Sequence, residues 1–498
     1  MRTGMVVESD RLPGELWPSA AADALRITYV GVGYDGRPRR VGGSVFLPAG
    51  APPAQGWPVV SYAHGTTGLS EHCAPSRTGL SRLERAHVDR WLAAGHVVAA
   101  TDYEGLDALG PHPYFNGEAV ADDVVDVVRA ARRLDDRVGA GWRVVGFSQG
   151  GHAALFTGLL ANRYAPELDF LGTIAMAPPV DLPRLIGLVS QDGRRPVSVF
   201  LPFLLAGVRT SHPDFDARPF LTAEGARLVD VAASATLAGV FRAIGGRTND
   251  EIGFTDFSHR PGVAPILHAC RVPVARMDRP VFVTAGTADE IVPVEVVERF
   301  VAELGAAGNS VRYRRFEGAS HADVLGAGVD ELLAWTGQPA EPFDADGNGR
   351  LTLDDYEVFA LRLVQAFGES PGSPAAVAVR DGYRALWRAV AARADVDADD
   401  AVSPAELHDW LTSTRDDAGF EREIRPLAES VIALADADRD GRLTTAELRR
   451  LSRACEAPGA LDHDHDGLVS VGELVAVVRD FCRDPAPGRP GGWLFGRA

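Results

Sequence analysis

The chain has 498 residues, of which 46% are apolar and 24% are charged, and its formal net charge is −18. This length is too great for one hydrophobic core, so we expect two or three soluble domains. The negative charge argues against nucleic acid and anionic membranes as partners, and no apolar run is long enough to predict a transmembrane segment. All 50 basic residues are arginine, which excludes Schiff-base lysine chemistry and a P-loop lysine.

The first two thirds of the chain alternate between short apolar runs and amphipathic segments. Residues 25–30 and 41–47 flank a Gly/Pro turn and predict an antiparallel hairpin. Buried strands are predicted at 58–63, 96–101, 144–145, 170–176, 280–285 and 311–316, and helices at 80–94, 118–134, 152–163, 294–304 and 322–335. Such alternation predicts an α/β fold with a mostly parallel sheet and right-handed crossovers.

Residues 180–270 interrupt this alternation with several short helical segments and no clear strand. Long structureless loops are rare in compact domains, so we interpret the segment as a helical cap insertion over an active site. An ordinary helical excursion is the alternative. The sheet domain would cover residues 20–335, followed by a Pro-containing linker at 336–342.

A G-x-S-x-G motif at 146–150 places Ser148 between a buried strand and a helical segment. This arrangement predicts the nucleophile elbow of an α/β hydrolase, where glycines are needed because the turn is sharp. A serine nucleophile needs a base, and the base needs an acid to orient it. In this fold the three come in the order Ser, Asp or Glu, His.

Asp289 and His321 complete that order, and each lies just past the C-terminal end of a predicted strand. Carboxyl ends of parallel strands meet at one edge of a sheet, so we expect Ser148, Asp289 and His321 to form a catalytic triad. Four other residues could replace members of this set, although none follows a strand so directly: His259, His268, Asp256 and Asp323.

An oxyanion would need two backbone N–H donors, one of them from the residue after the nucleophile. Gln149 would supply this donor. The loop at 64–68 would supply the other through Thr66, with His64 holding the loop. The alternative for this loop is a tight glycine turn without a catalytic role.

Four stretches together resemble the secretory lipase family of α/β hydrolases: YAHGTTG at 62–68, CAPS at 73–76, DYEGL at 102–106 and GFSQGG at 146–151. The resemblance implies a carboxylic ester hydrolase with an acyl-serine intermediate, acting on a small-molecule or lipid ester. Members of the family are normally exported, whereas the N-terminus shows no apolar signal segment, which predicts a cytoplasmic location. Cys73 and Cys270 could form a single bridge, but cytosolic thiols would stay reduced.

The last third is the most acidic part, with 30 acidic and 18 arginine residues over 341–498, and this asymmetry predicts a cation-binding module. Two loops match the EF-hand pattern at every ligand position, and we expect both to bind Ca²⁺ through carboxylates, a backbone carbonyl and a terminal Glu. The predicted ligands are Asp436, Asp438, Asp440, Arg442 and Glu447 in one loop, and Asp462, Asp464, Asp466, Leu468 and Glu473 in the other.

Two earlier loops match the pattern less well. The first ends in Asp355, whose shorter side chain favours Mg²⁺ or weaker Ca²⁺ binding, and the second has Asp400 where Gly is usual. Their predicted ligands are Asp344, Asp346, Asn348, Arg350 and Asp355, and Asp395, Asp397, Asp399, Ala401 and Glu406. Apolar residues at the eighth loop position predict short β bridges between paired loops: Leu351, Val402, Leu443 and Val469.

Four such loops over 343–483 resemble the calerythrin and sarcoplasmic calcium-binding group, which implies an all-α calcium-binding domain; residues 484–498 would be a disordered tail. The sequence therefore predicts a serine ester hydrolase tethered to a calcium-binding module. The tether also motivates the hypothesis that calcium regulates or stabilises the hydrolase. Two alternatives remain: a peptidase or amidase of the same fold, and a calcium buffer or sensor with an inactive hydrolase scaffold.

Overall fold

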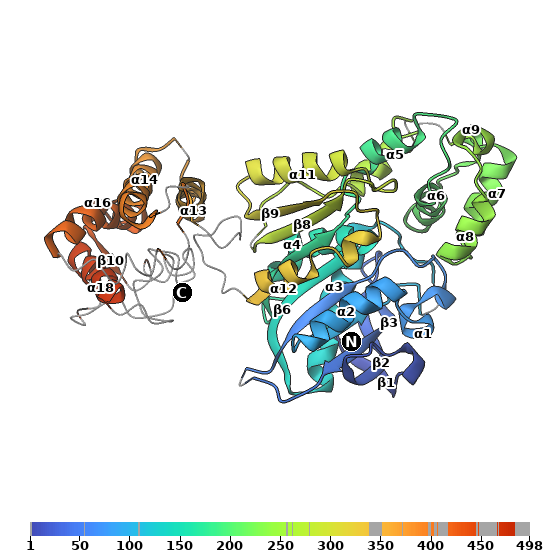
Figure 1. Cartoon of the computed structure of the whole chain (residues 1–498), viewed down its shortest axis with the longest axis horizontal. Coiled ribbons are helices and arrows are strands. Elements are labelled where there is room, and N and C mark those ends of the chain that lie inside the picture. Colours follow the sequence, from blue (N-terminus) through green and yellow to red (C-terminus); the bar gives the residue numbers. More distant parts are fainter. Residues whose placement is uncertain are drawn as a thin grey trace. The chain divides into compact units, whose positions relative to one another are not determined.

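A computed structural model describes residues 2–53, 55–107, 110–254, 257–260, 262–277, 279–337, 351–370, 372–396, 400–402, 406, 417–444, 447, 466 and 468–483. Its contacts divide the chain into two compact units, Met1–Ala334 and Trp335–Ala498 (Figure 1). The first unit begins before residue 20, because β1 (Val6–Arg11) pairs with β2 (Ala21–Val32).

Within the described part of the first unit, nine strands form one sheet in the order β1-β2-β3-β5-β4-β6-β7-β8-β9. The neighbours from β1 to β5 are antiparallel and those from β5 to β9 are parallel. The other strands are β3 (Pro38–Pro48), β4 (Trp57–Ala63), β5 (Val97–Thr101), β6 (Val138–Phe147), β7 (Asp169–Met176), β8 (Val281–Gly286) and β9 (Val311–Phe316). The predicted hairpin and mostly parallel sheet are confirmed. The edge strand β1 was not predicted, because none of its residues is fully buried.

Helices cover the sheet: α1 (Pro75–Thr78), α2 (Arg82–Ala93), α3 (Gly117–Leu134), α4 (Gln149–Tyr164), α11 (Val294–Ala306) and α12 (Val329–Gly337). The Ser81 and Asn116 side chains cap α2 and α3 by accepting a backbone N–H from the first turn. The prediction of one helix over 322–335 was wrong. A short 3-10 turn, Asp323–Leu325, comes first, and Gly328 takes φ 75°, a left-handed conformation that ends any continuous helix there. Helix α12 also includes residues 336 and 337 of the predicted linker; residues 338–342 lie outside the described part.

The insertion between β7 and β8 is helical, as predicted. It contains α5 (Leu182–Ser190), α6 (Phe200–Ser211), α7 (Ala223–Ala232), α8 (Leu237–Ile244), α9 (Asn249–Ile252) and α10 (Ala264–Ala269). These helices enclose an apolar cluster separate from that of the sheet. Figure 1 shows α6 to α9 gathered beyond one end of the sheet. We call residues 180–270 the cap.

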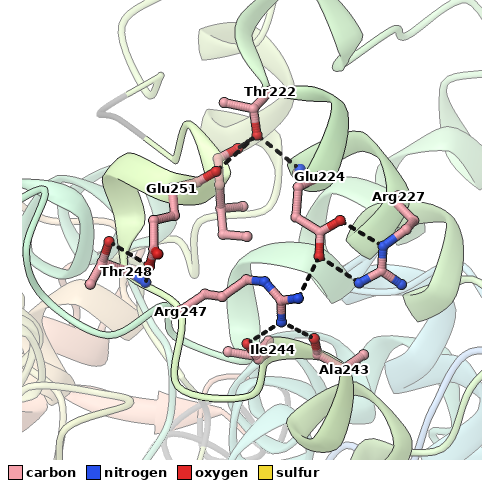
Figure 2. Close-up of polar contacts among 10 residues, drawn as sticks. Thr222, Glu224, Arg227, Ala243, Ile244, Arg247, Thr248 and Glu251 are labelled. Carbon is pink, nitrogen blue, oxygen red and sulfur yellow. Dashed lines mark hydrogen bonds and ion pairs between the residues drawn. The ribbon is translucent and has the colours of Figure 1, made fainter.

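A network of hydrogen bonds and ion pairs joins helices α7, α8 and α9 of the cap (Figure 2). The carboxylate of Glu224 on α7 accepts two hydrogen bonds from Arg227 and pairs with Arg247 at 3.1 Å. Arg247 also donates to two carbonyls at the end of α8, and Thr222 joins the start of α7 to the Ile252 carbonyl of α9. These contacts tie three consecutive helices into one body.

The cap leaves and rejoins the sheet domain at one place. The Val272 N–H donates to the Val180 carbonyl over 3.0 Å. Beside this bond, Arg271 pairs with Asp181 at 3.3 Å and with Glu303 of α11 at 3.2 Å. The two connecting segments are thereby fastened to each other and to the sheet domain.

The second unit contains α13 (Leu353–Ala366), α14 (Pro374–Ala394), α16 (Asp417–Ala435) and α18 (Val471–Arg483) around its own apolar cluster. The predicted loop pairings are confirmed. Leu351 and Val402 exchange two backbone hydrogen bonds of 2.8 Å, and β10 (Arg442–Thr444) pairs with β11 (Leu468–Ser470) through Leu443 and Val469. The predicted tail, 484–498, lies outside the described residues. Among the described helices, none is both long and apolar enough to cross a membrane.

Candidate active site

Ser148 lies at the turn from β6 into α4, in a backbone conformation (φ 54°, ψ −117°) that non-glycine residues rarely adopt. The glycines beside it are required by space. A Cβ at Gly146 would lie 1.9 Å from the Gly150 carbonyl oxygen, and a Cβ at Gly150 would lie 1.8 Å from the Ala63 oxygen. The Ser148 N–H donates to the Met176 carbonyl of β7 over 2.8 Å, which fixes the turn to the sheet.

Three side chains from separate strand ends form a continuous hydrogen-bonded chain. His321 Nε2 lies 2.8 Å from Ser148 Oγ, and His321 Nδ1 lies 2.6 Å from Asp289 Oδ2. The Asp289 side chain is 1% exposed, and its other oxygen accepts the N–H groups of Ile291 and Val292. A carboxylate held in this way accepts a hydrogen bond from Nδ1–H, so His321 Nε2 is left to receive a proton from Ser148.

The other candidates for base and acid do not take part in this chain. His259 and His268 are exposed. The Asp323 carboxylate accepts from the N–H and hydroxyl of Ser320 and so closes the local turn. Asp256 lies outside the described residues.

The loop after β4 packs directly against the elbow, as its predicted role requires. A Cβ at Gly65 would lie 2.9 Å from the Phe147 ring, so the two backbones can approach only because residue 65 is glycine. His64 is buried, and its Nδ1 lies 2.6 Å from the Gly65 carbonyl oxygen. Burial lowers the pKa of His64, so the ring is held neutral within this loop.

Glu84 also holds the loop, and sequence reasoning missed it. This buried carboxylate accepts the Gly65 N–H at 2.9 Å and the Ser81 hydroxyl at 2.8 Å. The S-x-x-E spacing of Ser81 and Glu84 is a capping-box pattern that marks the start of α2. The pattern identifies the helix start but does not reveal the contact with Gly65.

Thr66 and Gln149, the predicted oxyanion residues, both contact the segment 112–116. The Thr66 hydroxyl lies 2.6 Å from the Tyr114 hydroxyl. The Gln149 side chain is buried, and its Nε2 lies 2.7 Å from His112 Nε2. Sequence reasoning missed His112 and Tyr114, because the segment has no periodic pattern.

Tyr114 also borders a cavity of about 370 Å³. Its lining is largely apolar and includes Phe115, Phe156, Val208, Ile266 and Cys270, with Asn116, Glu118, Ser211 and His212 as polar members. Cys270 and Cys73 are both buried free thiols, so they form no bridge with each other. Burial raises the pKa of Cys270 to about 12, so this thiol is unreactive at neutral pH.

The cap is hydrogen-bonded to the chain just beyond Thr66. The Leu237 N–H at the start of α8 donates to the Thr67 carbonyl over 2.8 Å, and Thr236 forms a β bridge with Gly68. The Ser70 hydroxyl donates to the Ser234 carbonyl over 3.2 Å. The turn between α7 and α8 thus rests on the loop that carries Thr66.

In the second unit, the loop after α16 gathers the predicted calcium ligands. Oxygens of Asp436, Asp438 and Asp440 lie within 4.8 Å of one another, which fits the donor set of a hard cation. Glu447 reaches back across the loop, where it accepts the Ala437 N–H at 2.8 Å. Arg442, the predicted carbonyl ligand, is the first residue of β10.

The described parts of the other three loops share some of these features. In the second loop, Asp400 adopts φ 63° and donates its N–H to Asp395 at 3.1 Å, as Gly441 does to Asp436 in the third. Glu406 accepts the Val396 N–H at 3.1 Å. In the first and fourth loops, Asp355 and Glu473 close the turn by accepting from Thr352 and Ser470.

Ala401 follows Asp400 within the described segment, and Asp466 and Leu468 are described in the fourth loop. The remaining predicted ligands lie outside the described residues: Asp344, Asp346, Asn348, Arg350, Asp397, Asp399, Asp462 and Asp464.

Comparison with known proteins agrees with both units. A family model described as secretory lipase matches residues 70–339, more than half of the chain. A probable inactive lipase of Mycobacterium tuberculosis is 25% identical over 334 residues, which cover 63% of this chain and 72% of that protein. Lipase A of Moesziomyces aphidis is 23% identical over 351 residues, which cover 65% of this chain and 74% of that protein.

Solved structures show the same fold. The closed state of Candida antarctica lipase A aligns with TM-score 0.58 and 21% identity, covering 67% of this chain and 81% of that one. The rice cell wall degrading esterase LipA from Xanthomonas oryzae aligns with TM-score 0.55 and 17% identity, and the alignment covers 67% of this chain and 97% of that one. An EF-hand model matches residues 428–452, and calerythrin of Saccharopolyspora erythraea is 26% identical over 150 residues, covering 28% of this chain and 85% of that protein.

Proposed function

The chain belongs to the secretory lipase family, and on that premise we propose that it hydrolyses carboxylic esters through an acyl-serine intermediate. The observation that carries the proposal is the hydrogen-bonded chain from Ser148 through His321 to Asp289. Family membership alone would not suffice, since one relative is named a probable inactive lipase.

In the first half of the reaction, Ser148 Oγ attacks the ester carbonyl carbon while its proton passes to His321 Nε2. Asp289 stabilises the imidazolium that forms, without taking the proton itself. The carbonyl oxygen becomes an oxyanion, which the N–H groups of Gln149 and Thr66 would stabilise. His321 then gives the proton to the leaving alkoxide oxygen, the C–O bond breaks, and the acyl group remains on Ser148.

In the second half, His321 takes a proton from water as the water oxygen attacks the acyl carbon. Collapse of the second tetrahedral intermediate returns the proton to Ser148 Oγ and releases the carboxylic acid. We propose further that the ester has a hydrocarbon portion, because Tyr114, which bonds to Thr66, borders a cavity whose lining residues are mostly apolar.

A fluorophosphonate probe tests the nucleophile, since it should label the wild-type chain at Ser148 and leave Ser148→Ala unlabelled. A panel of p-nitrophenyl esters of graded chain length, run beside short peptide and amide substrates, tests the reaction class. Faster turnover of peptides would assign an amidase, and no labelling would leave a calcium-binding protein with an inactive hydrolase scaffold.

For the second unit, we propose that the loops bind Ca²⁺ and that bound calcium stabilises or regulates the hydrolase. The clustered carboxylates of Asp436, Asp438 and Asp440 support binding. There the ion would neutralise the carboxylates and order the loop, and it would take no part in ester chemistry. Turnover by the full chain that is identical in EGTA and in excess Ca²⁺ would refute regulation.

The compartment is open to a direct test as well. We propose a cytoplasmic location for this chain, whereas the description of its family as secretory favours export. Fractionation of cells that express the full chain decides between the two.

A further inference from the structure

Both predicted donors of the oxyanion hole are contacted by the same short segment. His112 bonds to the side chain of Gln149, and two residues later Tyr114 bonds to that of Thr66. We call residues 112–116 the strap. The strap is the last part of the connection from β5 to α3, so it belongs to neither loop that bears the donors.

We propose that the strap positions the oxyanion hole, with His112 fixing Gln149 and Tyr114 orienting the Thr66 hydroxyl. The inference rests on the proposed function, because it assigns the strap to the same reaction. His112 and Tyr114 are positioning residues in this account, since each acts through another side chain.

The direction of the His112 bond is set by its second partner. His112 Nδ1 lies 2.8 Å from the Glu104 carbonyl oxygen, which can only accept, so Nδ1 carries the proton. Burial lowers the pKa of His112 to about 4, which keeps the ring neutral and Nε2 bare. Gln149 Nε2 therefore donates to His112 Nε2.

The hydrogen bond to His112 is the main polar contact of the Gln149 side chain. Its amide oxygen is buried and has no hydrogen-bond partner among the described residues. Gln149 is 2% exposed and is the first residue of α4, so its side chain is held inside the protein beside the turn that carries the Gln149 N–H. Losing His112 would leave both ends of a buried amide unpaired.

The Tyr114 hydroxyl is likewise held by a hydrogen bond. Its bond to Thr66 is the one that the phenol makes among the described residues, and burial raises the pKa of Tyr114, so the phenol keeps its proton. When the Tyr114 O–H donates to Thr66 Oγ1, the Thr66 hydroxyl proton is free to point elsewhere. That proton is then a side-chain donor toward the oxyanion, in addition to the Thr66 N–H.

The strap is itself held rigidly. The His112 and Tyr103 rings stack with centroids 5.7 Å apart, and the Tyr103 hydroxyl donates to the His64 carbonyl over 2.9 Å. Phe115 is held at φ 60°, a conformation that costs energy for a non-glycine residue. A strained and largely buried segment is suited to fixing donors before the substrate arrives.

A double-mutant cycle between Tyr114→Phe and Thr66→Val tests the proposal, with turnover of a soluble p-nitrophenyl ester as the readout. Each variant removes one hydroxyl and keeps the backbone. We expect each to lower kcat roughly tenfold with KM within about twofold, and the double variant to be no slower than Thr66→Val. Affinity for an alkylboronic acid, whose serine adduct mimics the tetrahedral intermediate, should fall by the same factor.

A second cycle, His112→Phe with Gln149→Met, tests the other contact, with the same non-additivity expected. Tyr164→Phe is the matched control, because it removes a phenol that bonds to Asp126 at the far end of α4. The control should keep kcat and boronate affinity.

Any one of three results would overturn the strap's role. Tyr114→Phe could keep the wild-type kcat, or the losses in both cycles could be additive. The variants could also show losses in KM and Tm that Tyr164→Phe shares. These results would leave Ser148-dependent labelling intact, so the proposed function would survive them. Turnover that persists in Ser148→Ala would overturn both.

Discussion

The imidazole of His321 and the hydroxyl of Ser148 are 173 positions apart in the chain, yet Nε2 and Oγ lie 2.8 Å from each other. Ser148 follows β6 and His321 follows β9, with β7 and β8 between these strands in the sheet. All four strands are parallel, so their carboxyl ends face the same edge and the loops there converge.

Asp289→Asn should lower kcat by a factor on the order of 10⁴, because an amide no longer favours the His321 tautomer that accepts the serine proton. The measurement is ester turnover, with circular dichroism to confirm folding. Asp323→Asn is the comparison, since Asp323 bonds to Ser320 and not to His321. Equal losses in the two variants would contradict the assignment of Asp289.

Gly150→Ala should destabilise the fold by roughly 3 kcal/mol or more, because the new methyl would meet the Ala63 carbonyl at 1.8 Å. Gly305→Ala, on α11, meets nothing within 4 Å and should instead stabilise by about 0.5–1 kcal/mol through helix propensity. Urea unfolding of both variants measures the difference. A Gly150→Ala protein as stable as the wild type would show that the elbow can relax.

Much of the fold and of the candidate triad could be predicted, because periodic strands and the order of Ser148, Asp289 and His321 are local features of the chain. The loop pairing through Leu443 and Val469 was equally local, since it depends on one position in a repeated motif. For the candidate triad, the position of each residue in the loop after a strand was enough to select Ser148, Asp289 and His321, which form a hydrogen-bonded chain.

The contacts around the donors could not be predicted. Glu84 reaches Gly65 across 19 positions and His112 reaches Gln149 across 37, and both contacts depend on how helices and loops pack. The edge strand β1 also escaped prediction, since its partly exposed residues carry little apolar pattern. Tertiary packing decides such features, and one sequence does not display it.

Acid should destabilise the first unit partly through His152. Burial lowers its pKa from 6.5 to about 4, and its Nδ1 has no partner among the described residues. The unfolded chain therefore binds a proton more readily, so stability is complete above pH 6.5 and falls as the pH drops from 6.5 toward 4. Over that range, protonation of His152 should lower the free energy of unfolding by about 1.4 kcal/mol for each unit by which the pH decreases.

His152→Gln should remove this contribution, while its amide can still donate to the Cys270 carbonyl that His152 Nε2 contacts at 2.8 Å. Urea titrations at several pH values measure the slope. The exposed His268, replaced by Gln, provides the control, and its slope should match the wild type. If the dependence of the free energy of unfolding on pH is unchanged in His152→Gln, His152 does not cause the loss of stability at low pH.

Glu447→Gln should remove about one calcium site from the full chain, because an amide supplies one coordinating oxygen where a bidentate carboxylate supplies two. Isothermal titration calorimetry would then report one equivalent fewer, or one site weakened by roughly tenfold or more. Glu429→Gln, on α16 and outside the loop, is the control. Unchanged stoichiometry and affinity would place calcium elsewhere.

The bond between the Val180 carbonyl and the Val272 N–H has an architectural consequence. The chain leaves the sheet and returns to it beside this bond, but the cap is also bonded through Thr236 and Leu237 to Gly68 and Thr67, so a replacement of the residues between Val180 and Val272 must keep both attachments. A cap grafted from a relative should therefore leave Ser148 and His321 in register only when it reproduces the bonds to Thr67 and Gly68 as well as the bond between Val180 and Val272.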